Sequence, residues 1–336
     1  MSFKQMVLFG PWCGEFSYEY GWWVPEIRKK RNTEYSNFYA VHIGYDGRSF
    51  LYRDFIDEYI TYPKDIEESL TYPSNYGQKN QNDTYIGIPD NLMEFLDKII
   101  NSFEERFDDI VCYIPEADDG KVPIPRAYQQ KPYGEYLHYN PCERIINEVK
   151  NQICFEDSSR RMVSVLARTR HRVGTRCSYD WNPKNWEIFI DMLINLMNLN
   201  VCIVDIPPKN SSAGTLSFID SEVYMRNKKH IKIFTLDGSE SLERQSALLQ
   251  LSDCNIYGGG GSSSFAYFLK APLFTQQTLN EGPRRKFQWH LDLTDNFKNV
   301  YIFSKYDDSD MYDSSPVEMF CVFQEFFEGL VDDYEN

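Results

Sequence analysis

The sequence has few histidines and no closely spaced pair of cysteines. It contains eight cysteines and five histidines, and no two cysteines have the CxxC spacing. Zinc-ligand patterns are therefore missing. Most of the cysteines occur in apolar, strand-like or helix-like runs, which is typical of reduced, buried thiols in a cytosolic protein.

Long hydrophobic runs are also missing. No stretch approaches the ~20 apolar residues that a membrane-spanning helix needs. The apolar run within residues 1–10 is too short for a signal peptide. We therefore expect no membrane insertion and a cytoplasmic protein, located in the host cytoplasm if it is viral.

Positive charge is in the minority. The chain has 35 Lys and Arg against 50 Asp and Glu, a formal net charge of -15. Because neutralising phosphates supplies most non-specific affinity for nucleic acid, this balance disfavours a general nucleic-acid binder. Residues 306–336 hold ten of the acids and no Lys or Arg, which we interpret as a solvated helix face and tail.

The chain does contain a regular alternation of strands and helices. In the first half, strands are predicted at residues 5–9, 37–43 and 110–114, helices at about 15–31, 92–107 and 142–155, and loops at 62–90 and 115–141. In the second half, strands are predicted at 162–167, 201–206, 230–236, 253–257 and 271–275, and helices from Asn182-Pro183 onward and at 242–251, 262–270 and 316–330. This order predicts an α/β protein with mostly parallel sheets covered on both faces.

A polar segment at residues 156–161 is the predicted domain boundary. It gives an N-terminal domain of residues 1–155, a second domain of residues 156–310, and an acidic C-terminal helix and tail of residues 311–336.

A glycine-serine tract joins a predicted strand to a predicted helix in the second half. Glycine lets the backbone approach a ligand closely, and the first N–H groups of the helix lack partners. The residues that would hold a diphosphate are Gly260, Gly261, Ser262, Ser263 and Ser264. The tract is neither a Walker A loop nor a clean GxGxxG. The alternative is a plain turn with a serine N-cap.

Arginines follow the strand predicted at residues 162–167. Arg168, Arg170 and Arg176 lie in this segment, and the planar guanidinium suits bidentate phosphate contacts. Strand ends on one sheet edge would place them near the same diphosphate. The alternatives are a solvated basic loop and a contact with anionic nucleic acid.

The first predicted helix begins with acids and aromatic residues. Glu15 and Glu19 are four residues apart and share a helix face. Burial against aromatics raises the pKa of a carboxylate and suits it to general-base work. The aromatic residues Trp12, Tyr18 and Trp22 suit stacking on sugar rings or bases. The alternative is a helix whose acids complement its dipole and whose aromatics are core.

These motifs resemble those of a group of bacterial and viral glycosyltransferase-like proteins of the GT-B class. Gly14-Glu15-Phe16-Ser17-Tyr18-Glu19 is similar to their Gly-Glu-Phe-Gly-Trp-Glu pattern, with Ser17 and Tyr18 as departures. Arg168-Thr169-Arg170 with Asn185-Trp186 is similar to their Arg-x-Arg and Asn-Trp segment. The tract from Asp253 to Ser264 is similar to their donor loop.

The resemblance implies two Rossmann-like domains facing a cleft, with a C-terminal helix that crosses back to the first. The second domain would bind a nucleoside-diphosphate sugar through the glycine-serine tract, Arg168, Arg170 and Arg176. The first would bind the acceptor, with Glu15 as base and Trp12, Tyr18, Glu19 and Trp22 as contacts. No metal would be obligatory.

The acceptor and the activity stay open in the sequence. A glycan and a hydroxymethylated base in phage DNA are both possible acceptors, and the acidic net charge disfavours DNA. The alternatives to a transferase are a non-catalytic nucleotide- or phosphosugar-binding protein, and a kinase or sulfotransferase on a similar sheet. The missing Walker A lysine counts against the last.

Overall fold

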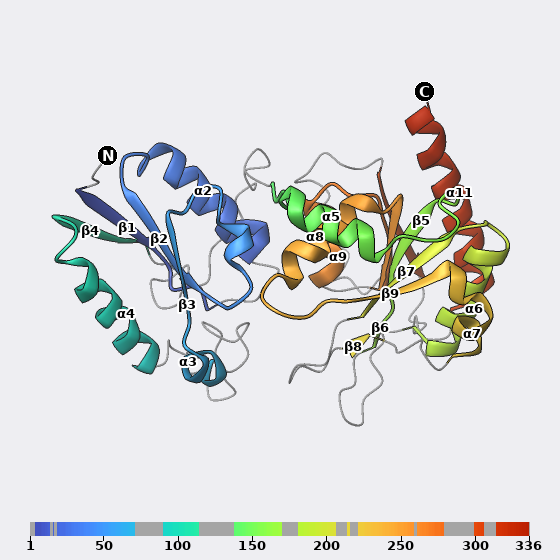
Figure 1. Cartoon of the computed structure of the whole chain (residues 1–336), viewed down its shortest axis with the longest axis horizontal. Helices are drawn as coiled ribbons and strands as arrows, with labels where there is room; N and C mark the ends of the chain where they lie inside the picture. Colours follow the sequence, from blue (N-terminus) through green and yellow to red (C-terminus); the bar gives the residue numbers. More distant parts are fainter. Residues whose placement is uncertain are drawn as a thin grey trace. The chain divides into compact units, whose positions relative to one another are not determined.

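The computed structural model describes residues 4–13, 16, 19–70, 90–113, 138–169, 181–205, 214–215, 221–258, 261–278, 299–305 and 314–335. The chain forms two compact units, Met1–Tyr139 and Asn140–Asn336. Each unit contains its own parallel sheet (Figure 1). The predicted α/β class with two Rossmann-like units is confirmed.

The first unit contains a four-stranded sheet in the order β3-β2-β1-β4. Its strands are β1 (Gln5–Phe9), β2 (Tyr39–Gly44), β3 (Glu58–Thr61) and β4 (Asp109–Tyr113). Its helices are the π-helix η1 (Glu19–Trp23), α2 (Val24–Thr33), the 3-10 helix η2 (Ser49–Leu51), α3 (Lys64–Ser69) and α4 (Asp90–Phe103). Figure 1 shows α2 and α4 on opposite sides of the sheet, which explains why β1 is buried after its first residue.

The second unit contains a six-stranded parallel sheet in the order β12-β11-β10-β5-β7-β9. Its strands are β5 (Met162–Leu166), β7 (Asn200–Asp205), β9 (Ile231–Thr235), β10 (Cys254–Gly258), β11 (Leu273–Thr278) and β12 (Val300–Lys305), and the short β6 (Arg168–Thr169) and β8 (Gly214–Thr215) pair separately. Its helices are α5 (Glu143–Gln152), α6 (Pro183–Asn195), α7 (Glu222–Asn227), η6 (Lys228–His230), α8 (Ser241–Leu251), α9 (Gly261–Phe268) and α11 (Pro316–Glu335).

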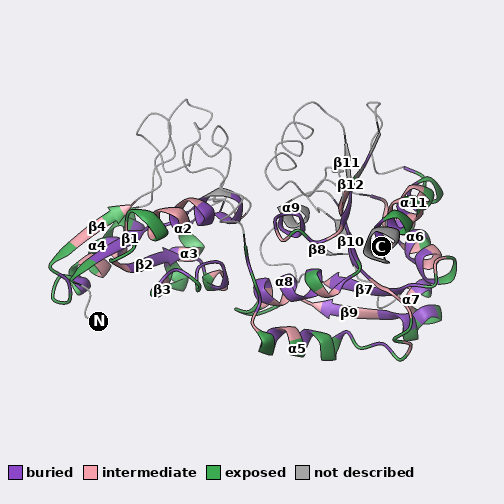
Figure 2. Ribbon diagram, turned by 90° about the horizontal axis from the view of Figure 1, so that it is seen from above, coloured by how far each residue is buried: buried purple, intermediate pink, exposed green. Residues whose placement is uncertain are grey.

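Helices cover both faces of this second sheet. Figure 1 shows α5, α8 and α9 on one side and α6, α7 and α11 on the other. The central strands are therefore buried along nearly their whole length, as Figure 2 shows for β7. Such two-sided burial explains the continuous apolar runs of these strands. Helix α6 begins as predicted, because the Asn182 side chain accepts a hydrogen bond from the Lys184 N–H at 3.0 Å.

The C-terminal helix belongs to the second unit. Met319, Phe320, Phe323, Phe327 and Leu330 lie in the same core as the buried residues of α6. The expectation that this helix crosses back to the first domain stays a prediction. Its apolar face packs into the core of the second unit.

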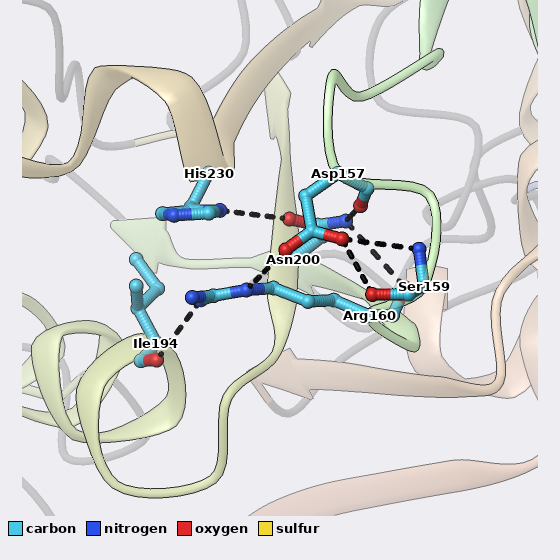
Figure 3. A network of polar contacts seen from close by, with 6 residues as sticks. All are labelled: Asp157, Ser159, Arg160, Ile194, Asn200 and His230. Atoms are coloured by element: carbon cyan, nitrogen blue, oxygen red, sulfur yellow. Dashed lines mark hydrogen bonds and ion pairs between the residues drawn. The ribbon is translucent and has the colours of Figure 1, made fainter.

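The division between the units precedes the predicted boundary. It lies after Tyr139, because α5 packs against α8 of the second unit. The polar segment at residues 156–161 is a tight turn within that unit (Figure 3). Asp157 accepts hydrogen bonds from Ser159 and Arg160, and Asn200 donates to the Asp157 carbonyl oxygen at 2.8 Å.

Three other expectations differ from the structure. Residues 64–69 of the predicted loop form α3, and residues 71–89 and 114–137 lie outside the described residues. The predicted helix at about 15–31 is a π-helix followed by α2, which starts at Val24. The expectation of buried cysteines is wrong for Cys112, Cys154 and Cys321, which are exposed, and Cys142 is half-buried. Cys13, Cys202 and Cys254 are buried and free, and Cys177 lies outside the described residues.

Candidate functional site

The two predicted donor-binding segments leave neighbouring strands of the second sheet. β5 and β10 are parallel partners, and Leu166 pairs with Tyr257 near the carboxyl ends of the two strands. Arg168 and Gly259 each come two residues after this pair. The arginine segment and the glycine-serine tract therefore start at the same edge of the sheet, where ligands bind in open parallel sheets.

Helix α9 follows β10 almost at once. It begins at Gly261, so Ser262, Ser263 and Ser264 lie in its first turn. The N–H groups of a first turn have no partner within the helix and carry partial positive charge. A helix N-terminus at the end of a central strand is a place where an anion can bind.

Several predicted site residues lie outside the described residues, and for several others only the helix or strand that contains them is known. Glu15, Tyr18, Arg170, Arg176 and Gly260 are outside the described residues. Arg168 is described as part of β6, Gly261 and Ser262–Ser264 as part of α9, and Trp22 as part of η1, in each case without the side chain. The roles of all these residues stay predictions.

In the first unit, the loop that follows β1 is tied to neighbouring elements by hydrogen bonds. Gly10 has φ +105, and a Cβ there would lie 3.0 Å from the Trp12 nitrogen and 3.1 Å from the Ile43 oxygen. Only glycine fits such a backbone without strain. The Trp12 N–H donates to the Ile43 carbonyl oxygen at 3.2 Å, which ties the loop to the end of β2.

Side chains hold three carbonyl groups along this segment. Tyr62 Oη donates to the Trp12 oxygen at 3.0 Å, and Tyr45 Oη donates to the Cys13 oxygen at 3.3 Å. His42 Nδ1 donates to the Phe9 oxygen at 2.8 Å. The backbone that leads to Glu15 is thus fixed from several elements, as a preorganised site requires.

Glu19 and Trp12 lie in the interior. Trp12 is 1% exposed and stacks on Trp23, with ring centroids 5.6 Å apart. Glu19 is 0% exposed and begins the π-helix η1. Both have the surroundings of core side chains, although we expected them to contact the acceptor.

A polar cluster surrounds the buried Glu19 carboxylate. Tyr52 Oη donates to Glu19 Oε1 at 2.6 Å, and the Arg48 guanidinium pairs with Oε2. Burial raises the pKa of Glu19, while the charge of Arg48 and the hydrogen bonds from Tyr52 and Arg48 act to lower it. Single π-helical turns are frequent at functional sites.

His42 lies beside this cluster. Its ring stacks on Tyr52 with centroids 3.9 Å apart, and it is fully buried. Because Nδ1 carries the proton donated to Phe9, Nε2 is a lone-pair acceptor, and among the described residues it has no partner. Burial lowers the pKa of His42 to about 3, so the ring is neutral at physiological pH.

The sequence reasoning missed Arg48, Tyr52 and His42. A histidine inside an apolar strand is the one local signal, since a polar ring in such a run requires a specific partner. Arg48 follows the turn that ends β2, and nothing in its neighbourhood marks it as the partner of Glu19.

The described part of the chain contains no cluster of metal-ligating side chains and no helix that could span a membrane. In that part, no three His, Cys, Asp or Glu side chains come close enough together to hold a metal ion. Across the same residues, every helix is too short or too polar to cross a bilayer.

The fold is that of two-domain glycosyltransferases. No protein-family model matches the chain, and no curated protein matches it in sequence. Solved structures do match along almost the whole length, and their descriptions are those of glycosyltransferases.

Three of these structures show the extent of the likeness. ADP-heptose lipopolysaccharide heptosyltransferase II of E. coli matches with a TM-score of 0.53 and 12% identity, over 96% of this chain and 98% of that one. A glycosyl transferase family 9 protein of Veillonella parvula matches with a TM-score of 0.54 and 12% identity, over 98% of each chain. The E. coli heptosyltransferase WaaC with ADP matches with a TM-score of 0.51 and 10% identity, over 96% and 99%. At such identities the likeness shows the shared GT-B fold.

Proposed function

We propose that this protein is a glycosyltransferase that moves a sugar from a nucleoside-diphosphate sugar to an acceptor hydroxyl. The observation that carries the proposal is the junction of β10 with α9 beside the end of β5. The likeness to structures described as heptosyltransferases, one of them with ADP, supports a nucleotide-linked donor.

The donor diphosphate would lie against the first turn of α9. The N–H groups of Gly261 and Ser262–Ser264 and the hydroxyl groups of these serines would bind phosphate oxygens, with Gly260 allowing close approach. Arg168, Arg170 and Arg176 would neutralise the charge that grows on the leaving diphosphate, so that no metal is obligatory.

The acceptor would be activated by the first unit. Glu15 is the proposed base that takes the proton from the acceptor hydroxyl as the glycosidic bond forms. Tyr18 and Trp22 would contact the acceptor. Trp12 and Glu19, being buried, would support this site from behind.

Of the two acceptor classes, a glycan fits better than a hydroxymethylated base in phage DNA. The net charge of -15 opposes contact with a phosphate backbone. An electrophoretic shift with hydroxymethylated duplex DNA tests this choice directly, and retarded duplex at physiological salt would favour the DNA acceptor.

A thermal-shift panel tests the donor. Nucleoside diphosphates and their sugars, including ADP and ADP-heptose, should raise the unfolding midpoint, since a ligand stabilises the state that binds it. The double variant Arg168→Ala, Ser262→Ala should stay folded and lose the shift. If no nucleotide at millimolar concentration raises the midpoint, the proposal fails.

Turnover separates a transferase from a binding protein. Release of nucleoside diphosphate from the donor should fall by about 10²-fold or more in Glu15→Gln, the usual contribution of a general base. The donor-induced thermal shift should be retained. A wild-type protein that binds donor without releasing diphosphate would be a non-catalytic binder.

A further inference from the structure

Arg48 lies at the edge of the first sheet where the opening loop begins. It follows the turn after β2 and immediately precedes η2. β1 and β2 are parallel neighbours, with Phe9 paired to His42, so their carboxyl ends share one edge. Arg48 is therefore on the same side of the sheet as the loop that leads to Glu15.

Two other arginines of this unit are each held by several protein acceptors. The Arg28 side chain is 2% exposed and donates to Asp54 and to the carbonyl oxygens of Leu51 and His138. Arg31 donates to two carbonyl oxygens and to Asp57. Each of these two arginines is bound to three protein acceptors within the fold.

Arg48 is different in this respect. Its side chain stays 20% exposed, and within the described part of the chain Glu19 is the one acceptor of its hydrogen bonds. A guanidinium has five N–H donors, so most of them are left for another partner. The arginine is fixed in place and still presents donors.

Glu19 fixes Arg48 from the interior. The carboxylate is 0% exposed, and its other oxygen is held by Tyr52, so it has no surface of its own to offer a ligand. The rings of Phe16 and Tyr45 flank the guanidinium, with centroids 5.2 and 4.2 Å from Cζ. The resulting patch combines N–H donors with aromatic faces.

The charge of the pair indicates which ligand it suits. The negative charge of Glu19 cancels that of Arg48, so an anionic ligand gains little attraction there. The N–H donors and aromatic rings suit the hydroxyl groups and apolar face of a sugar. We propose that Arg48 contacts the acceptor, that Glu19 positions Arg48, and that the pair selects an uncharged sugar over an anionic one. This inference rests on the proposed function.

The test compares two probes on the full-length protein. Methyl β-D-glucopyranoside is the neutral probe, and methyl β-D-glucuronoside is its charged counterpart. Ligand-observed NMR titration should give tighter binding of the neutral probe by wild type. Arg48→Ala and Arg48→Lys should each weaken that binding about tenfold or more, because lysine lacks the planar array of donors.

Glu19→Gln supplies a signature that a merely structural role would not produce. It leaves the charge of Arg48 uncompensated, so preference should move from the neutral probe toward the glucuronoside. Should this variant fail to fold, the Arg48→Lys titration decides by itself, because that substitution keeps the ion pair with Glu19.

Arg106 provides a matched control. It also pairs with a glutamate, Glu58 at 3.6 Å, and lies over Phe103 at 4.9 Å, but it precedes β4 at the opposite edge of the sheet. Arg106→Ala should leave both affinities unchanged.

Two failures are distinguishable. If wild type shows no donor-induced thermal shift, the proposed function fails and this inference with it. If the donor shift is present, three results each overturn the inference alone. These are no binding of the neutral probe, unchanged binding in both Arg48 variants, and a folded Glu19→Gln protein with unchanged preference.

Discussion

At the scale of single residues, the first unit keeps several polar groups away from water around one loop. Glu19, His42 and Arg28 are all 1% exposed or less. Burying such groups costs free energy unless each has partners, and the partners come from distant parts of the sequence. The hydrogen bonds that hold the loop after β1 are therefore also what makes this unit sensitive to pH and to small substitutions.

His42 should make the protein sensitive to acid. Its folded pKa, lowered to about 3 by burial, lies below the ordinary value of 6.5. Between about pH 3 and pH 6.5, His42 is therefore protonated in the unfolded chain and neutral in the folded protein. The contribution of the neutral His42 to the free energy of unfolding is complete above about pH 6.5 and is lost as the pH falls toward 3. At about 1.4 kcal/mol per pH unit, the total loss is up to ~5 kcal/mol.

Urea unfolding of wild type and His42→Phe at several pH values checks this. Phenylalanine keeps the stacking on Tyr52 but cannot titrate, and it loses the hydrogen bond to Phe9, a cost of about 1 kcal/mol. Wild type should be more stable than His42→Phe at pH 7 and less stable than it at pH 4. A stability difference that is independent of pH would contradict the assignment.

Tyr52→Phe should destabilise the fold by about 2 kcal/mol. The substitution leaves Oε1 of the fully buried Glu19 without its 2.6 Å hydrogen bond. An unsatisfied buried acceptor costs more than the bond itself contributes. Denaturant unfolding measures the loss, and Tyr224→Phe, on a half-buried tyrosine of α7, is the comparison. Equal effects at the two positions would mean that Glu19 does not depend on Tyr52.

At the scale of elements, α11 contributes five buried side chains to the core of the second unit, as many as α6. Phe323 is 0% exposed and contacts the rings of Phe189 on α6 and Phe274 on β11. The start of the helix is also tied to α6, because Trp181 Nε1 and Asn185 Nδ2 both donate to the Ser314 oxygen, at 2.9 and 3.0 Å.

Phe323→Ala should therefore cost about 3–5 kcal/mol, as expected for a buried phenylalanine. Val317→Ala on the same helix, at a side chain 54% exposed, should change stability by less than about 0.5 kcal/mol. Chemical denaturation followed by circular dichroism measures both. Similar losses in the two variants would show that helix propensity, rather than packing, holds α11.

The sequence predicted those elements in which buried residues follow a simple pattern, either helical spacing or a continuous run. The buried residues of α6 recur every three or four positions, and β7 is buried at five successive residues. Those missed lack that pattern. β3, at an edge of its sheet, has only four residues, which are half-buried or exposed and show no alternation of buried and exposed positions.

The candidate site was predictable only in its local parts. The junction of β10 with α9 is a run of adjacent residues, so composition alone marks it. The pairing of Glu19 with Arg48 joins residues 29 positions apart, and that of Trp12 with Tyr62 joins residues 50 apart. No spacing rule covers such contacts, because they depend on strand order and on which side chains share a sheet edge.

At the scale of the whole molecule, the two units should fold independently. Each has a parallel sheet and a core of its own, and the division lies between Tyr139 and Asn140. The residues on either side are held by their own unit. Tyr139 donates to the Tyr20 oxygen, while the Cys142 N–H donates to Glu243 at 2.8 Å.

The assignment of α5 to the second unit predicts how fragments of the chain behave. A fragment of residues 140–336 retains α5 and its contacts with α8, including the hydrogen bond from Arg244 to Gln152 at 2.6 Å. A fragment of residues 156–336 begins at the polar segment instead and loses the buried Ile145 and Val149. Two such side chains contribute about 3–6 kcal/mol together. That is a large fraction of the stability of an ordinary domain.

The longer fragment should unfold in one cooperative transition, with a midpoint close to that of the second unit in the whole protein. The shorter fragment should unfold at a lower denaturant concentration or aggregate on expression. Ile145→Ala in the whole protein removes one of the same buried contacts of α5, and it should lower the stability of the second unit only. Equal midpoints for the two fragments would place α5 outside the second core, and would favour the predicted boundary at residues 156–161.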